Sequence, residues 1–159
     1  MEFVIGDEVV YPHHGASVIE GVETLSFAGS PRDYFVLRFG YADLTLHIPV
    51  DGTEAVGLRR VIGADEVDEV FAVLRKADAR TPSNWSRRFK NHTEMLRSGD
   101  VYQLAEVVRN LAHRKATSHL SSAEQRMLER ARRALVSELS LAMGVDTEEA
   151  DRRLDSELE

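Results

Sequence analysis

β-Branched and aromatic residues crowd the first third of the chain, separated by turns rich in Gly and Pro, a pattern typical of short β-strands. In residues 44–48, apolar Leu and Ile alternate with Thr and His, so one face is buried and His47 is expected to point outward. Four or five strands in so few residues fit a small Tudor-like (SH3-like) barrel. The pattern predicts strands at residues 9–11, 16–22, 34–39 and 44–49.

From about residue 65 the apolar residues recur at spacings of three and four, which predicts helices. Residues that favour helix N-termini precede the apolar stripes: Asp65, Asn84, Asp100, and Ser121 with Glu124 as a capping box. Gly144 is expected to end the long fourth helix, and Thr147 to cap a short acidic one. The expected fold class is α+β, with a β-barrel over residues 1–53, a glycine-punctuated linker at 54–63 and an all-α bundle over 64–159. The stripes are Val67, Val70, Phe71 and Leu74; Val101, Leu104, Val108 and Leu111; and Leu128, Ala131, Leu135 and Ala142.

The charge of the chain is unevenly distributed. The formal net charge is -7, yet residues 83–143 carry eleven basic and six acidic residues. Residues 1–53 carry eight acidic and two basic residues, and residues 144–159 carry seven acidic and two basic ones. A basic helical segment within an acidic chain fits either a solvated helix surface or a local nucleic-acid footprint.

The segment N-W-S-R-R-F-K at 84–90 holds the only tryptophan of the chain, Trp85, followed by Arg87, Arg88 and Lys90. A ring beside cations suits a protein that holds phosphates while disturbing base stacking. We expect Trp85 to share a helix face with Phe89, His92 and Leu96, a spacing that by itself favours a core anchor. In the DNA-binding interpretation Trp85 projects from the first turn of a helix, while the three cations track a nucleic-acid backbone.

Sequence signals for other functions are weak. The adjacent histidines His13 and His14 lack a third ligand at a suitable spacing, so we expect no metal site. The chain has no cysteine and no nucleotide-binding or nucleophile motif, so we expect no cofactor, no small-molecule substrate and no enzymatic activity. We expect a cytoplasmic protein without membrane association, since no signal peptide or membrane span is recognised.

Four ordered motifs resemble the CarD/CdnL family of bacterial RNA polymerase-binding transcription regulators. They are G-D-E-V-V-Y-P-H-H-G at 6–15, D-L-T-L-H-I-P at 43–49, N-W-S-R-R-F-K at 84–90 and S-G-D-V at 98–101. The resemblance implies a Tudor-like domain, shared with the transcription-repair coupling factor, that docks on the polymerase β subunit. It also implies a helical domain that contacts promoter DNA at the upstream edge of the melted bubble. There Trp85 would wedge into the minor groove and Lys90 would hold the backbone.

The chain departs from the family pattern on the barrel. Members of the family commonly carry basic residues that contact the polymerase at the positions of Leu25 and His47. We therefore expect the polymerase contact to be weaker or differently built, relying on Leu25, Phe27 and strand pairing, with His47 a partial substitute when protonated. The Leu25→Arg substitution is expected to strengthen polymerase binding.

The predicted function is that of a monomeric transcription regulator that binds RNA polymerase and stabilises the open promoter complex. Two alternatives remain open on the sequence alone. One is a protein–protein adaptor of the same fold with weakened polymerase binding. The other is a free-standing DNA-binding protein, which would shift DNA in a gel without polymerase and with steep salt dependence.

Overall fold

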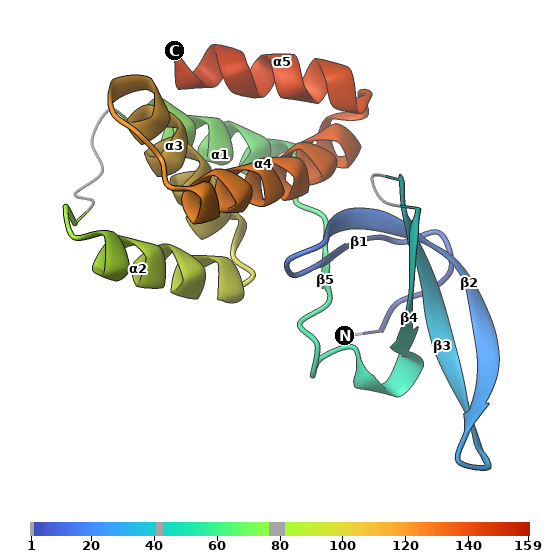
Figure 1. Ribbon diagram of the computed structural model, residues 1–159. Coiled ribbons are helices and arrows are strands. Elements are labelled where there is room, and N and C mark those ends of the chain that lie inside the picture. Colours follow the sequence, from blue (N-terminus) through green and yellow to red (C-terminus); the bar gives the residue numbers. More distant parts are fainter. Residues whose placement is uncertain (1, 41–42, 77–81) are drawn as a thin grey trace.

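The computed structural model describes residues 2–40, 43–76 and 82–159, and it has an antiparallel β-sheet followed by helices (Figure 1). The strands are β1 (Glu8–Tyr11), β2 (Gly15–Phe27), β3 (Ser30–Phe39), β4 (Leu44–Pro49) and β5 (Arg59–Arg60), and they are arranged in the order β4-β3-β2-β1-β5. The helices are α1 (Ala64–Arg75), α2 (Trp85–Arg97), α3 (Val101–Thr117), α4 (Ser122–Met143) and α5 (Thr147–Leu158). The expected α+β class, with the β-domain first, is confirmed.

The β2–β3 hairpin is longer than the sequence pattern predicted. Its turn falls at Ala28 and Gly29, whose φ angles of 53° and 82° are both positive. Two successive positive φ angles are typical of turns whose twist matches that of the flanking strands, so pairing extends to Phe27 and Ser30. Pro31, expected in the turn, instead lies in the strand opposite Ser26. The tip of this long hairpin points away from the helices (Figure 1).

The sheet buries one face in a hydrophobic cluster of its own. The expected linker contributes to this cluster through Leu58, and β5 pairs with β1, so the β-domain uses residues beyond 53. The cluster consists of Phe3, Val9, Ile19, Phe35, Leu37, Phe39, Ile48 and Leu58.

The helices bury a second cluster, drawn from α1, α3, α4 and α5. The apolar stripes at helical spacing supply most of it, as the sequence predicted: Val67, Val70, Phe71, Leu74, Val101, Val108, Leu111, Leu128, Ala131 and Leu135 are all buried. Leu104 and Ala142, expected on the same stripes, are only partly buried and pack against the cluster. Helix α2 differs, because its two buried residues are the polar Arg88 and His92. Hydrophobic burial therefore explains the attachment of α2 only in part.

Polar contacts fix the two domains against each other. The guanidinium of Arg59 donates two hydrogen bonds, of 2.7 and 2.8 Å, to the carboxylate of Glu138 on α4, which is fully buried. The backbone N–H of Ala16 donates to Ser137 Oγ at 2.8 Å. At Gly15 a β-carbon would lie 2.6 Å from Ser137 Oγ, so only glycine lets the strand approach α4 this closely. These contacts predict one preferred domain orientation.

Candidate nucleic-acid interface

Helix α2 begins where the sequence predicted, because Asn84 caps it. Asn84 Oδ1 accepts a hydrogen bond of 3.0 Å from the backbone N–H of Arg87, which satisfies one of the free donors of the first turn. Trp85 is therefore the first residue of the helix, at the edge of the domain. Its side chain stays 42% exposed, which separates it from the buried core residues.

Two contacts hold the exposed indole of Trp85. Its ring stacks on that of Phe89, one turn later, with centroids 5.1 Å apart and planes 14° apart. Its Nε1–H donates a hydrogen bond of 2.9 Å to Ser121 Oγ, the residue that caps α4. The stacking matches the shared helix face expected from the sequence. A ring that is both exposed and braced can offer a free edge or face to another molecule.

The structure corrects the expectation that Arg88 is available to a nucleic-acid backbone. Arg88 is 2% exposed and its Nε and Nη2 donate to the two carboxylate oxygens of Glu124, at 2.7 and 3.2 Å. Its Nη1 donates to the carbonyls of Pro82 and Ser83, each at 3.2 Å. All of these partners belong to the same helical domain, so Arg88 has a structural role.

A sequence signal for this pair existed on α4. Glu124 lies four residues before Leu128 and so falls on the apolar stripe that faces the core. A carboxylate on a buried stripe requires a basic partner. Burial opposes ionisation of Glu124, but the hydrogen bonds from Arg88 and from the Ser121 backbone outweigh it and hold the pKa of Glu124 below its ordinary value.

Arg87 and Lys90 remain exposed, as predicted. They are three residues apart on α2 and therefore share a face of the helix. Neither side chain forms an ion pair with any residue in the described part of the chain, so both charges are available to a phosphate. With Trp85 they form what we call the α2 surface, consisting of Trp85, Arg87 and Lys90.

His92, the next polar residue on α2, lies inside the domain and outside the α2 surface. It is 2% exposed and its Nε2 lies 3.2 Å from Asn110 Nδ2. Burial lowers the pKa of His92 to about 4, so the imidazole is neutral near pH 7. It therefore offers no positive charge to a phosphate.

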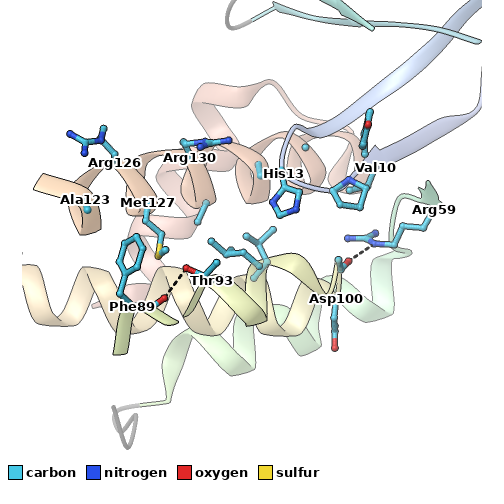
Figure 2. Close-up of a pocket in the computed structure, with 18 residues that line it drawn as sticks. Val10, His13, Arg59, Phe89, Thr93, Asp100, Ala123, Arg126, Met127 and Arg130 are labelled. Atoms are coloured by element: carbon cyan, nitrogen blue, oxygen red, sulfur yellow. Dashed lines mark hydrogen bonds between the residues drawn. The ribbon is translucent and has the colours of Figure 1, made fainter. Parts of the chain in front are cut away.

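A cavity of about 410 Å³ lies between the two domains, where α2 and α4 face the end of β1 (Figure 2). Phe89 lines it on one side and Met127 and Arg130 of α4 line it on another, with His13 at the domain boundary. Phe89 therefore stacks on Trp85 and also lines the cavity. Among the described residues, no group of three or more His, Asp or Glu side chains could hold a metal ion.

The three residues expected to contact polymerase share the outer face of the sheet. Leu25 and Phe27 are two residues apart on β2 and therefore point to the same face. His47 of β4 lies opposite Val36 of β3, which is two residues from Tyr34 and so belongs to that face as well. His47 Nε2 lies 3.0 Å from Glu23 Oε2, a residue of the same face. We call this surface the hairpin face, consisting of Glu23, Leu25, Phe27, Arg32, Tyr34 and His47.

Phe27 is the most prominent member of the hairpin face. Its ring is 63% exposed and meets Tyr34 edge to face, with centroids 5.9 Å apart. The sequence reasoning missed Arg32, which pairs directly opposite Leu25 and donates a hydrogen bond of 2.8 Å to Asp51. The register that brings Arg32 beside Leu25 depends on the turn at residues 28–29, and the sequence pattern misplaced that turn.

In the described part of the chain, no helix is long and apolar enough to cross a membrane.

The comparisons with known proteins cover almost the whole chain. A family model described as CarD-like/TRCF RID domain matches residues 3–62, and one described as CarD, C-terminal domain matches residues 69–155. The YdeB protein of Bacillus subtilis (strain 168), whose assigned name is that of a transcription factor, is 31% identical over 143 residues, which cover 90% of this chain and 94% of YdeB. A solution NMR structure of the 72-residue N-terminal domain of Myxococcus xanthus CarD is 24% identical, with a TM-score of 0.32, and covers 37% of this chain and 79% of that chain.

Proposed function

The chain belongs to the CarD family of transcription factors, which interact with RNA polymerase, and we propose that it stabilises the open promoter complex through the α2 surface. In this proposal Trp85 packs against DNA at the upstream edge of the melted bubble, as a wedge in the minor groove. Arg87 and Lys90 contact the adjacent phosphates. The observation that carries the proposal is the exposed, braced indole of Trp85 beside two cations without ion-pair partners among the described residues.

The energetics favour this mechanism. Separating stacked bases costs a few kcal/mol per step, and closure of the bubble recovers that energy. Stacking of a base on an aromatic side chain returns about 1–3 kcal/mol. Because 1.4 kcal/mol changes an equilibrium about tenfold, one well-placed ring is enough to shift the ratio of open to closed complexes.

The β-domain supplies the connection to polymerase, and we propose that the hairpin face docks on the β subunit. Phe27 offers exposed aromatic area for a buried contact. Arg32 places a cation beside Leu25, where the family pattern has a basic residue. Docking raises the effective concentration of the α2 surface at the promoter, so an acidic protein need not bind free DNA tightly.

The domain contacts support a mechanism that depends on fixed geometry. The Arg59–Glu138 pair and the Ala16–Ser137 hydrogen bond join the β-domain to α4, and Ser121 at the start of α4 contacts Trp85. Pre-organised partners lose less conformational entropy on binding. The hairpin face and the α2 surface would therefore reach polymerase and DNA at a set distance.

The adaptor function is the second candidate, because the hairpin face is partly neutralised. The carboxylate of Glu23 lies beside His47, and Asp51 pairs with Arg32, which leaves little free positive charge for an acidic polymerase surface. Co-purification with core polymerase at near-physiological salt separates the two functions. Retained binding supports open-complex stabilisation, and loss of binding favours the adaptor.

A matched pair of substitutions makes this experiment sharper. Leu25→Arg adds a cation to the hairpin face and is expected to raise the affinity for core polymerase. Ser26→Arg adds the same charge on the neighbouring exposed residue of β2, which points to the opposite side of the strand. Equal effects of the two substitutions would show that only net charge matters and would remove the hairpin face from the proposal.

A further inference from the structure

The indole of Trp85 is connected to the interior of the domain by a short chain of hydrogen bonds. Ser121 Oγ accepts the Nε1–H of Trp85 at 2.9 Å and the backbone N–H of Glu124 at 3.1 Å. The Ser121 hydroxyl is also 3.4 Å from Glu124 Oε1, to which it can donate its own proton. A hydroxyl has one donor and two acceptor positions, so this arrangement uses the full capacity of Ser121.

The next link is the buried ion pair between Glu124 and Arg88. Both side chains are almost completely buried, at 1% and 2% exposed. Arg88 then binds the carbonyls of Pro82 and Ser83, which lie just before α2. The N-terminus of α2 is therefore tied to the N-terminus of α4 on both sides of Trp85.

Stability alone is a poor explanation for this arrangement. Replacing a buried ion pair by well-packed apolar residues of similar volume often costs no stability. What apolar residues cannot do is accept the indole N–H in a fixed direction. The stacked ring of Phe89 leaves the indole free to slide in its plane, whereas a hydrogen bond at Nε1 fixes its rotation.

We propose that Ser121, Glu124 and Arg88 are positioning residues that hold the indole of Trp85 in a single pose ready for DNA. Ser121 acts directly on the ring, Glu124 orients the Ser121 hydroxyl, and Arg88 fixes Glu124 and the entry of α2. Only the predicted effect of these residues on the open promoter complex rests on the proposed function. The positioning of the ring is a property of the free protein and can be measured without DNA.

The test begins with Ser121→Gly in the full chain. Glycine keeps most of the capping effect at a helix N-terminus, so α4 is retained while the acceptor for Trp85 is lost. Ser122→Gly is the matched control, because Ser122 is the exposed neighbour in the first turn of α4. Trp85 is the only tryptophan, so its indole N–H gives a single resonance in a ¹⁵N-correlated NMR spectrum.

The expected result in the free protein is a shifted Nε1–H resonance for Ser121→Gly. Its hydrogen exchange with water should rise about twofold to tenfold, the range that corresponds to a typical net hydrogen bond. Ser122→Gly should leave both quantities unchanged. An unchanged resonance and exchange rate in Ser121→Gly would overturn the positioning role.

The lifetime of the open complex supplies the second measurement, as a double-mutant cycle. Ser121→Gly should shorten the lifetime about twofold to fivefold in the native chain, and it should have no effect in a Trp85→Phe background, which lacks the N–H donor. Equal shortening in both backgrounds would overturn the proposal, since a merely structural role acts regardless of the donor. If Trp85→Ala leaves the lifetime unchanged while the NMR result holds, the function of Trp85 fails and its positioning stands.

Glu124→Gln tests the deeper link separately. It keeps the shape of the side chain but weakens the acceptor for Ser121 and the pair with Arg88. We expect an Nε1–H shift in the same direction as that of Ser121→Gly. A lower melting temperature with an unchanged indole resonance would show that the ion pair is structural only, and it would remove Glu124 and Arg88 from the positioning residues.

Discussion

Arg87 is exposed and its neighbour Arg88 is buried, so replacing each by methionine should affect different properties. Arg88→Met should lower the stability of the fold, and Arg87→Met should weaken DNA binding. Arg88→Met removes the guanidinium but keeps an apolar side chain in the space beside Glu124. The remaining Glu124 carboxylate, 1% exposed, would be left buried without its cation. Arg87 is exposed and has no ion-pair partner among the described residues, so Arg87→Met changes only the surface.

The magnitude follows from the burial of the pair. Removing one partner of a buried ion pair costs about 3–5 kcal/mol. For a chain of 159 residues each kcal/mol lowers the melting temperature by about 2–4 °C, so Arg88→Met should lower it by about 6–20 °C. Arg87→Met should change the free energy of unfolding by less than about 0.5 kcal/mol.

The destabilisation by Arg88→Met should depend on pH. The folded-state pKa of Glu124 lies below its ordinary value of 4.5, so its contribution to stability is present above that pH and is lost as the pH falls through the folded pKa. In Arg88→Met burial would act without the opposing hydrogen bonds and would raise that pKa. The difference in stability between the two proteins should therefore be large at pH 7 and should shrink as the pH falls from the raised pKa of the variant, above 4.5, to the lowered pKa of the native protein, below 4.5.

Thermal unfolding followed by circular dichroism between pH 4 and 7 tests this reasoning, with DNA binding measured in parallel. Arg87→Met should fold normally and bind DNA with a salt slope smaller by about 0.9, the value for one lost phosphate contact. A normal melting temperature for Arg88→Met, together with a reduced salt slope, would refute the assignment. It would mean that Arg88 faces DNA, as the sequence pattern alone had suggested.

Three further predictions concern the domain interface and the interior. Gly15→Ala should lower the free energy of unfolding by about 1–3 kcal/mol in denaturant titrations, because its φ is +97° and the new β-carbon would lie 2.6 Å from Ser137 Oγ. Arg59→Met leaves the fully buried Glu138 without its cation and should separate one calorimetric transition into two, one for each domain. His92 should contribute a fall of about 3 kcal/mol in wild-type stability as the pH drops from 6.5 to 4, since the unfolded chain takes up a proton that the buried His92 (pKa about 4) does not. His92→Leu should reduce the dependence of stability on pH by that amount.

Local signals explain what the sequence predicted well. Asn84, Asp100 and Ser121 each cap the helix expected to follow them, since a capping side chain bonds to backbone groups two or three residues away. The start of α5 was misplaced by one residue, because Asp146 caps it and Thr147 is already helical. Either side chain can act as a cap, so the local pattern did not distinguish them.

Signals that depend on distant residues were missed. The burial of Arg88 requires Glu124 from a helix thirty-six residues away, and the run of basic residues at 87–90 gave no hint that one of them faces inward. The short strand β5 was expected to be a linker, since two arginines have no apolar pattern and pair only because β1 lies beside them. The exposure of Trp85 also depended on the tertiary structure, because an aromatic residue in a first turn fits both the core and the surface.

The most direct test of the central claim is the lifetime of the open promoter complex with wild-type protein and with Trp85→Ala. Polymerase binding is measured in the same samples as the control. The proposed function predicts that Trp85→Ala binds polymerase normally and shortens the lifetime about fivefold to a hundredfold, which corresponds to loss of one aromatic stacking contact. An unchanged lifetime with polymerase binding intact would contradict the claim that Trp85 holds the bubble open.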